Sequence, residues 1–468
     1  MLFPTLSFGF FFLIVYAGAW GLKGSNEWRK IVLLVASWFF YGCWDARFVV
    51  LLIASALLNW GTARLILAAE GRPVLRKAWL AAGIAANLII LGFFKYYGFF
   101  LVELEALLHQ LGWQRDLAIM QVILPVGVSF FTFQGMSYVI DIYRRQTEPA
   151  GLLDMTLLMS FFPHLVAGPI VRASHLIPQF QRAPEISRSM AAMGIALIVW
   201  GLFKKTVIAS ELSTGLVDEV FFDPAAHGSV DLLAAVYGYA VQIYCDFSAY
   251  SDMAVGLAAL LGYRFPHNFN QPYRARSLQE FWRRWHISLS SWLRDYLYVP
   301  LGGSRHGLHR LCLALAATML LGGLWHGASW NFVIWGALQA AVLVAERLWR
   351  EFKPQRWPTL PDGLCILFTF HIVCLSWIFF RAASFGDAIA FLAGLFAGGG
   401  TNMLTPMLLG LILLGMSLHF APRFSLQRIA MRIRALPAPT VGFAAGLAIL
   451  LVDSMRPEGV APFIYYQF

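Results

Sequence analysis

Charged side chains are scarce in this sequence of 468 residues, because Asp, Glu, Lys and Arg together make up only 13% of it. A soluble globular domain carries roughly 25% charged residues. Polar stretches are correspondingly rare, since 59% of the residues are hydrophobic and the mean hydropathy is +0.65. This composition excludes an ordinary soluble protein and predicts a protein that resides in the membrane.

Several motifs that carry common enzyme chemistry are absent from the sequence. There is no GxSxG, no GxxxxGK[ST] and no HExxH, and the five cysteines form no CxxC. These absences exclude the usual sequence forms of serine hydrolases, P-loop enzymes and zinc proteases. The sequence also shows no internal repeat of the sort found in the two halves of many transporters.

Long apolar runs are present throughout, from Leu2–Trp20 to Val441–Val452. A helix needs about 20 apolar residues to cross the bilayer, so the runs predict an all-α, polytopic integral membrane protein of about ten to thirteen membrane segments. The shorter runs are expected to form re-entrant or amphipathic helices. No Lys or Arg precedes the first run, which is therefore interpreted as a retained membrane segment and not a signal peptide. We expect one transmembrane domain over residues 1–468.

The formal net charge of +10 comes from basic residues that cluster between apolar runs. Cytoplasmic loops of membrane proteins carry such a surplus of Lys and Arg. The clusters are therefore predicted to be cytoplasmic loops beside the lipid bilayer, and no nucleic-acid partner is expected. They include Arg29 with Lys30, Lys204 with Lys205, and Arg347 with Arg350.

One long polar interruption, residues 264–310, holds eight arginines against two acidic residues, Glu280 and Asp295. Ser277 and Glu280 have the spacing of a capping box, which predicts that a helix begins there. Aromatic residues threaded among the arginines are typical of a membrane interface or a buried groove that suits an anionic ligand. On one continuous helix an apolar stripe is expected at Trp282, Trp285, Leu289 and Trp292, and a polar stripe at Gln279, Arg283, His286 and Ser290.

A second unusual feature is His326, which lies inside Leu311–Ala345, a stretch of 35 residues without any charge. One straight helix of that length would span roughly 52 Å, so it must tilt, break or turn back, and Gly322, Gly323 and Gly327 mark the predicted place. A histidine at such a break is either a structural hydrogen-bonding residue or a functional one facing a cavity. Ser329 and Asn331 add polar groups there, and Trp325, Trp330 and Trp335 are expected to wall a pocket.

Two carboxylates, Asp246 and Asp252, interrupt another apolar run. Each is a possible counter-ion for an arginine or an orienting group for a histidine, but a structural ion pair inside the helix bundle is the favoured interpretation.

Two weaker features involve histidine. The segment FFPHLVAGPIVR, with His164 and Arg172, is either an anion site at a broken helix or a simple helix end. His306 and His309 lie among arginines, where histidines are usually solvated, so no metal site is expected.

Several long motifs in this sequence resemble the membrane-bound O-acyltransferase family, and most closely its bacterial alginate O-acetyltransferase branch. They are EFWRRWHISLSSWLRDYLYVPLGG, LGGLWHG, YCDFSAYSDMAVGLAALLGYRFPHNFNQPY, FFPHLVAGPIVR and SFFTFQGMSYVIDIYR. The resemblance implies an all-helical bundle around a central tunnel in the bacterial inner membrane. It also implies that acetyl-CoA is the donor substrate, with no permanently bound cofactor, and that acetyl is delivered toward the periplasm.

The resemblance also implies roles for individual residues. His326 is the expected principal catalytic histidine and His286 the second. Beside them, we expect Trp325 to have a structural or orienting role. His326 would act as general base on the acceptor hydroxyl, and His286 would position or stabilise the oxyanion as an imidazole or imidazolium donor. A covalent acetyl-histidine relay stays open as a variant. The CoA thioester is expected to approach through Arg283, Arg284, Trp285 and Arg294.

The family resemblance further implies periplasmic partner proteins that pass acetyl to a secreted polysaccharide, which could be alginate, cellulose or another polymer. Three alternatives remain. The first is a D-alanyl-type acyltransferase that uses a carrier-protein thioester, the second a solute transporter, and the third a non-catalytic scaffold for a polysaccharide synthase.

Overall fold

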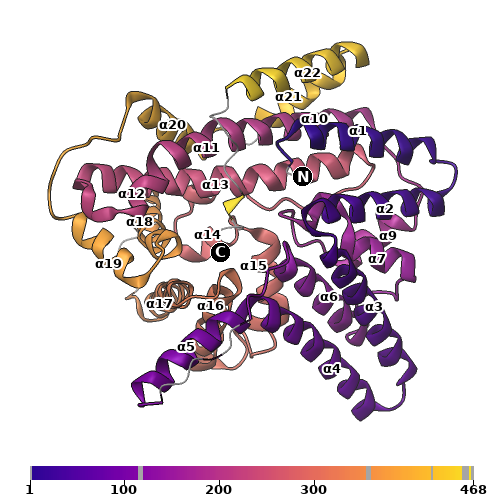
Figure 1. Cartoon of the computed structure of the whole chain (residues 1–468), viewed down its shortest axis with the longest axis horizontal. Coiled ribbons are helices and arrows are strands. Elements are labelled where there is room, and N and C mark those ends of the chain that lie inside the picture. The colour runs from indigo at the N-terminus through magenta and orange to yellow at the C-terminus, as the bar shows by residue number, and fades with distance from the viewer. Residues whose placement is uncertain are drawn as a thin grey trace. The chain divides into compact units, whose positions relative to one another are not determined.

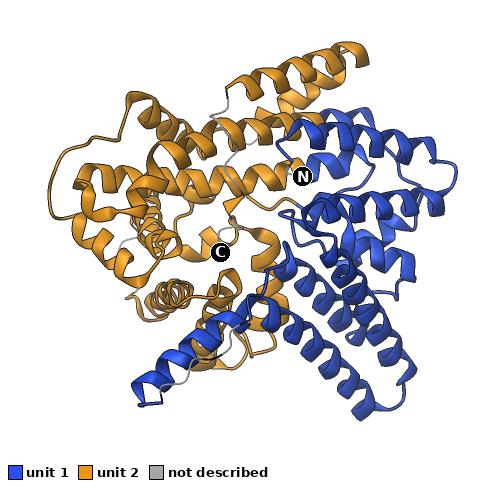
Figure 2. Ribbon diagram, in the orientation of Figure 1, with its two compact units in different colours: residues 1–194, 254–266 blue, residues 195–253, 267–468 orange. Residues whose placement is uncertain are grey.

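The computed structural model describes residues 3–113, 117, 120–354, 360–422, 425–455 and 463–464. The described residues form helices and no β-strand, which confirms the predicted all-α class (Figure 1). They divide into two compact units, residues 1–194 with 254–266 and residues 195–253 with 267–468 (Figure 2).

The helices that begin within the first 194 residues have the following bounds: α1 Leu6–Gly21, α2 Asn26–Asp45, α3 Arg47–Ala68, α4 Pro73–Leu91, η1 Gly92–Tyr96, α5 Tyr97–Gln110, α6 Val128–Tyr143, α7 Leu152–Ser160, α8 Phe162–Leu165, α9 Ala173–Phe180 and α10 Arg188–Phe203. The later helices are η2 Lys204–Ala209, α11 Ser210–Leu212, η3 Ser213–Val217, α12 Asp218–Phe222, η4 Pro224–Ala226, α13 Ser229–Leu260, η5 Pro272–Arg274, α14 Leu278–Trp282, α15 Ile287–Leu293, η6 Arg294–Tyr298, α16 Gly307–His326, α17 Trp330–Phe352, α18 Asp362–Arg381, α19 Phe385–Gly394, α20 Pro406–Ser417, α21 Ser425–Ala435 and α22 Ala438–Ser454.

Six helical stretches of the described chain are long and apolar enough to cross a membrane. Four further apolar helices, α1, α19, α20 and α22, are shorter, with 10 to 17 residues each. Many of the predicted segments therefore exist as helices, but fewer of them reach a full span than the ten to thirteen expected. The six long stretches are Arg47–Ala68, Pro73–Gln110, Arg188–Phe222, Gly307–His326, Trp330–Phe352 and Asp362–Arg381.

Two basic clusters predicted to be cytoplasmic loops are buried in helices instead. In the first unit, Arg29 and Lys30 lie on α2, where Lys30 Nζ is 2.8 Å from Asp154 Oδ1. In the second unit, Lys204 and Lys205 lie on η2, a π-helical continuation of α10, and both are buried. The loop prediction was wrong for these residues because charge counting along the sequence cannot detect a distant carboxylate that compensates a buried cation.

In the second unit, α16 and α17 lie side by side as a hairpin (Figure 1). Their close approach depends on glycine, since a Cβ added at Gly323 would collide with the Phe332 carbonyl oxygen and one at Gly336 with the Met319 carbonyl oxygen. The chain turns back between His326 and Trp330, which confirms the predicted break in the uncharged stretch. The break itself falls at Gly327, and Gly322 and Gly323 remain helical.

Candidate active site

The predicted helix at Ser277 begins where expected but does not continue. The Ser277 hydroxyl accepts a hydrogen bond from the Glu280 backbone N–H at 3.1 Å, whereas the Glu280 carboxylate accepts from the backbone N–H of Arg276 and not of Ser277. Helix α14 then ends at Trp282, and α15 begins only at Ile287. The continuous helix that we predicted is therefore broken over residues 283–286.

The break changes the surroundings of His286. Its backbone is left-handed, with φ +40° and ψ 55°, a conformation that non-glycine residues adopt uncommonly and mostly for a specific structural reason. The side chain is fully buried, whereas Arg283 and Ser290 line an open cavity. The prediction that His286 shares a polar face with Arg283 is consequently wrong.

Asn268 fixes the orientation of the His286 ring. The backbone N–H of Ser288 donates to Asn268 Oδ1 at 3.1 Å, and the Ser288 hydroxyl donates to the same atom at 2.9 Å. An atom that receives a backbone N–H must be the amide oxygen, so His286 Nδ1, 3.2 Å away, must carry the proton that it donates to Asn268. The second ring nitrogen, Nε2, therefore holds the lone pair.

Burial of His286 disfavours the charged imidazolium and lowers the pKa of this side chain to about 3. The ring is therefore neutral near pH 7. A neutral ring with its proton on Nδ1 accepts a hydrogen bond at Nε2 and cannot donate one there. This geometry favours a role in accepting from a hydroxyl over the oxyanion-donor role expected from the sequence.

His326, the last residue of α16, is enclosed by aromatic rings. Its ring centroid lies 5.1 Å from Trp335 and 5.2 Å from Phe380, and both rings meet it edge to face. Trp325 lies between the two histidines, with its ring centroid 5.1 Å from His326 and 6.1 Å from His286. The structure thus brings His326, Trp325 and His286 together in one cluster.

Of the other aromatic and polar neighbours expected around His326, some are buried and one is exposed. Trp335 is buried as predicted, but Trp330 is 55% exposed at the start of α17 and does not wall the cluster. Asn331 is buried, and its Nδ2 donates to the Ala382 carbonyl oxygen at 2.8 Å. Phe380 of α18, which the sequence did not predict, also packs against the His326 ring.

A cavity of about 570 Å³ lies in the second unit, and it is linked to this cluster by the lining residue Trp282, whose ring centroid is 5.8 Å from that of Trp335. Four arginines line it, Arg283, Arg294, Arg347 and Arg350, and the lining residues include no acidic side chain. Arg350 is held by Gln279 at 2.6 Å and by Glu346 at 3.2 Å, both distances being from a guanidinium nitrogen to a side-chain oxygen. Arg283 has no ion-pair partner within the described part of the chain, so its charge is available to a ligand.

The four residues expected to contact CoA are thus in three kinds of environment. Arg283 and Arg294 line the cavity, and Arg294 is also paired with Asp295 at 2.7 Å. Arg284 is directed to Glu280 at 2.6 Å and to the Asn270 carbonyl oxygen at 3.2 Å. Trp285 is buried in a cluster of aromatic rings.

Arg347 and Arg350 were missed as cavity residues because they were assigned to a cytoplasmic loop. They lie instead near the C-terminal end of α17, and their spacing of three residues places them on one face of that helix. Asn268 carried no recognisable signal, because its role depends on the unpredicted break between α14 and α15.

Asp246 and Asp252 of α13 pair with neighbouring lysines and not with arginine or histidine. Lys205 Nζ lies 2.8 Å from Asp246 Oδ1, and Lys204 Nζ lies 2.7 Å from Asp252 Oδ2. Lys204 also donates to the Ser248 hydroxyl at 2.7 Å. The favoured interpretation as structural ion pairs is confirmed by these contacts, and a direct orienting contact with either catalytic candidate is not observed in the described residues.

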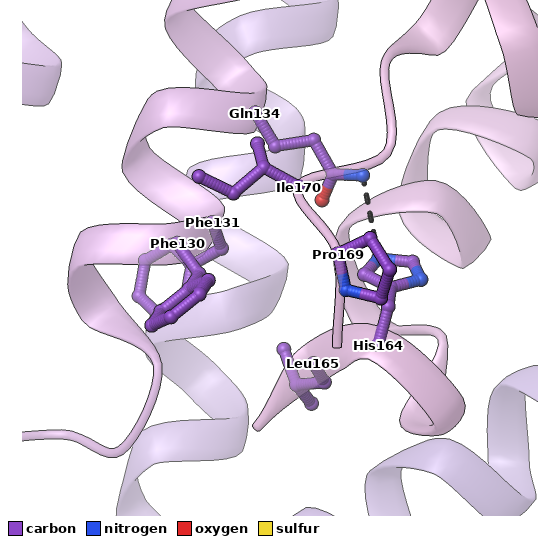
Figure 3. A pocket seen from close by; sticks show the side chains of 7 residues that line it. All are labelled: Phe130, Phe131, Gln134, His164, Leu165, Pro169 and Ile170. Atoms are coloured by element: carbon purple, nitrogen blue, oxygen red, sulfur yellow. Dashed lines mark hydrogen bonds between the residues drawn. The ribbon is translucent and has the colours of Figure 1, made fainter. Parts of the chain in front are cut away.

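His164 lies in the first unit, beside a small cavity that Phe130, Gln134 and Pro169 help to line (Figure 3). Its Nε2 is 3.3 Å from Gln134 Nε2 and 3.1 Å from the Leu158 carbonyl oxygen. Burial lowers the pKa of this imidazole to about 4, so the ring is neutral near pH 7 and offers no charge to an anion. The contacts support the simple helix end, since α8 stops at Leu165.

Within the described residues, no group of three or more His, Cys, Asp or Glu side chains could hold a metal ion. His306 immediately precedes α16 and His309 is exposed in its first turn. The five cysteines are unpaired thiols, and Cys245 and Cys374 are buried.

Comparison with known proteins gives a consistent set of similarities. A model of the membrane-bound O-acyltransferase family matches residues 137–385, a range that contains both His286 and His326. The chain is 38% identical over 408 residues to the probable alginate O-acetylase of Azotobacter vinelandii, with 85% of this chain and 79% of that protein covered. It is 35% identical over 428 residues to the peptidoglycan O-acetyltransferase of Helicobacter pylori, with 86% and 79% covered.

A more distant similarity connects the chain to another kind of acyl transfer. The teichoic acid D-alanyltransferase of Bacillus subtilis is 28% identical over 282 residues, with 56% of this chain and 69% of that protein covered. The family resemblance and the branch predicted from the motifs are confirmed by these comparisons.

Proposed function

The chain belongs to the membrane-bound O-acyltransferase family, and on this premise we propose that it transfers acetyl from acetyl-CoA to hydroxyl groups of a secreted polysaccharide. It is a multi-pass membrane acyltransferase, because the family match and the membrane-spanning helices agree. The observation that carries the proposal is the pair of buried histidines around Trp325, next to a basic cavity.

The basic cavity supports acetyl-CoA as the donor. Arginine binds phosphate groups through charge-assisted hydrogen bonds and can do so in a bidentate manner. CoA carries several phosphate charges at its nucleotide end and a thioester at the other end of a long uncharged arm. Arg283, Arg347 and Arg350 would hold the phosphates, while Leu311 and Leu315 on the same cavity wall suit the arm.

The same cavity bears on the alternative donor, which is the carrier-protein thioester of a D-alanyl-type acyltransferase. A carrier-bound thioester presents a single phosphodiester, which needs less positive charge than free CoA. Four arginines lining one cavity therefore favour free acetyl-CoA as the donor.

The proposed reaction begins when a polysaccharide hydroxyl gives its proton to His326 and its oxygen attacks the thioester carbonyl carbon. The new C–O bond forms as the C–S bond breaks, and the CoA thiolate takes the proton from His326. His326 becomes positively charged during this step, and the C-terminal end of a helix, where it lies, is where positive charge is best accommodated. The reacting hydroxyl has only this one proton, so His286 would accept a hydrogen bond at Nε2 from a neighbouring hydroxyl of the same sugar and so orient the acceptor.

We further propose that the enzyme resides in the bacterial inner membrane and takes its donor from the cytoplasm. Acetyl would then be delivered toward the periplasm with the help of partner proteins. The support for these details is the family membership and the names of the relatives, among which alginate and peptidoglycan are both represented. The acceptor that we propose is a secreted polysaccharide, a class that includes alginate, cellulose and similar polymers.

The donor site is tested by replacing Arg283 with Ala and measuring CoA release at varied acetyl-CoA concentration. Loss of one charge-assisted hydrogen bond should raise the KM for acetyl-CoA about tenfold with little change in kcat. The matched control is Arg276→Ala, because Arg276 pairs with Asp362 away from the cavity. Equal KM values for the two variants, or turnover only with an acetylated carrier protein, would refute the proposed donor.

A further inference from the structure

The segment Phe463–Ile464 lies in the core of the second unit. There Ile464 contacts Asp246, which precedes it by 218 positions in the sequence. Both side chains are essentially fully buried. The backbone N–H of Ile464 donates to Asp246 Oδ2 at 2.8 Å. This part of the sequence is thus attached to the middle of α13.

The attachment completes the coordination of a buried carboxylate. Asp246 is 2% exposed. Its Oδ1 forms an ion pair with Lys205 Nζ, and its Oδ2 accepts a hydrogen bond from the Ile464 backbone N–H, each at 2.8 Å. A buried charge is tolerated only when it is paired and its remaining lone pairs are satisfied. Ile464 therefore supplies a hydrogen bond that is costly to lose, which holds the segment in one place.

The neighbouring aromatic residue connects this attachment to the site. The Phe463 ring centroid lies 4.5 Å from Tyr250 and 5.7 Å from Phe247. Phe247 follows Asp246 directly, and its ring meets the His286 imidazole edge to face at 4.6 Å with an interplanar angle of 83°. One side of Phe247 is therefore supported by Phe463 while its ring packs against a proposed site histidine.

We propose that Phe463 and Ile464 are positioning residues for His286, which act through Asp246 and Phe247 on α13. This inference rests on the proposed function, since it assigns the segment to the site of acetyl transfer. The carboxylate contact fixes the segment, Phe463 supports the Phe247 ring, and Phe247 limits the orientations open to His286. Asn268 holds the imidazole by a hydrogen bond from Nδ1, and Phe247 restrains it by packing.

A purely structural anchor would use the same contacts, so the test must separate stability from catalysis. The variant is Phe463→Ala, and the matched control is Phe391→Ala. Phe391 is also fully buried in the second unit, where its ring packs against Phe221 at 4.4 Å on α12, away from His286. Both variants remove the same ring from a packed interior and should lower the melting temperature.

The two variants are expected to differ in kinetics. Because small displacements of a catalytic group are costly, Phe463→Ala should lower kcat about tenfold or more with an unchanged KM for acetyl-CoA. Phe391→Ala should keep the kcat of the unsubstituted enzyme. If Phe463→Ala does not fold, Phe463→Leu serves as the second variant, with an expected loss of about threefold in kcat at unchanged KM.

Full kcat in Phe463→Ala or Phe463→Leu, or an equal loss of kcat in Phe391→Ala, would overturn the positioning role. Failure of the proposed function is recognised separately, because the unsubstituted enzyme itself would then release no CoA from acetyl-CoA.

Discussion

At the scale of single residues, the chemistry of the site depends on which nitrogen of each histidine carries a proton. The His286 tautomer follows from one asparagine, since Asn268 Oδ1 accepts from both the backbone and the side chain of Ser288 and leaves only a donor role for His286 Nδ1. The sequence motif predicted that His286 is the second catalytic histidine. Its tautomer required the structure, because it depends on a contact with a residue 18 positions away, and its left-handed backbone lies in a break between helices that the sequence did not predict.

Replacing Asn268 tests the tautomer. Asn268→Ala removes the acceptor at Nδ1, so both tautomers become accessible, and we expect kcat to fall by a factor of about 10 to 100. Asn268→Asp keeps an acceptor at this position and should retain more activity than Asn268→Ala. The measurement is kcat for CoA release in both variants, and equal activities would argue against tautomer control.

The pH dependence of Asn268→Asp gives a second prediction at this scale. In the unsubstituted enzyme the pKa of His286 is lowered to about 3, so its protonation should not reduce activity as the pH falls from 8 to 5. A carboxylate beside Nδ1 favours the imidazolium and raises that pKa. As the pH falls, His286 of the variant should therefore become protonated, and activity should be lost, at a higher pH than in the unsubstituted enzyme. Superimposable pH profiles of kcat/KM would contradict this account.

At the scale of helices, glycine sets the distance between α16 and α17 and thereby the place of His326. The length of the uncharged stretch predicted that it must tilt, break or turn back near its glycines, and the structure shows that it breaks at Gly327 and turns back. The sequence did not show that Gly323 serves helix contact while Gly327 marks the turn, because this distinction depends on the facing residue Phe332.

Gly323→Ala should separate the two helices and destabilise the protein. The added methyl collides with a backbone oxygen, which cannot move aside as a side chain could, so we expect a loss of about 1–3 kcal/mol in the free energy of unfolding. Gly410→Ala is the control, because a Cβ at this position in α20 meets no atom within 4 Å. Thermal unfolding in detergent compares the two, and equal melting temperatures would rule out the proposed contact.

The ion pair between η2 and α13 gives a test of buried charge. Lys205→Met leaves the Asp246 carboxylate buried without its cation and should cost about 3–5 kcal/mol. Adding Asp246→Asn removes that charge and keeps an acceptor for Ile464, so the double variant should regain most of the loss. Strictly additive effects on the free energy of unfolding would show that the two residues are not coupled.

At the scale of the whole molecule, composition and the length of apolar runs predicted the class correctly, and long motifs predicted the family. The errors share a physical cause. Arg29, Lys30, Lys204 and Lys205 were placed in loops because local charge suggested water, whereas distant tertiary contacts stabilise them inside helices. The basic cavity was predicted only in part for the same reason, since Arg347 and Arg350 lie on α17 whereas Arg283 lies in the break between α14 and α15.

The central claim is that His326 transfers the proton in acetyl transfer from acetyl-CoA, and sealed proteoliposomes test it most directly. Labelled acetyl-CoA is enclosed with the enzyme in the membrane, and CoA release and label outside are measured with periplasmic extract. His326→Ala should lower both by at least about 100-fold, whereas His309→Ala, an exposed histidine of the same helix, should keep them. Unchanged transfer by His326→Ala, or transport of intact solute without CoA release, would contradict the account.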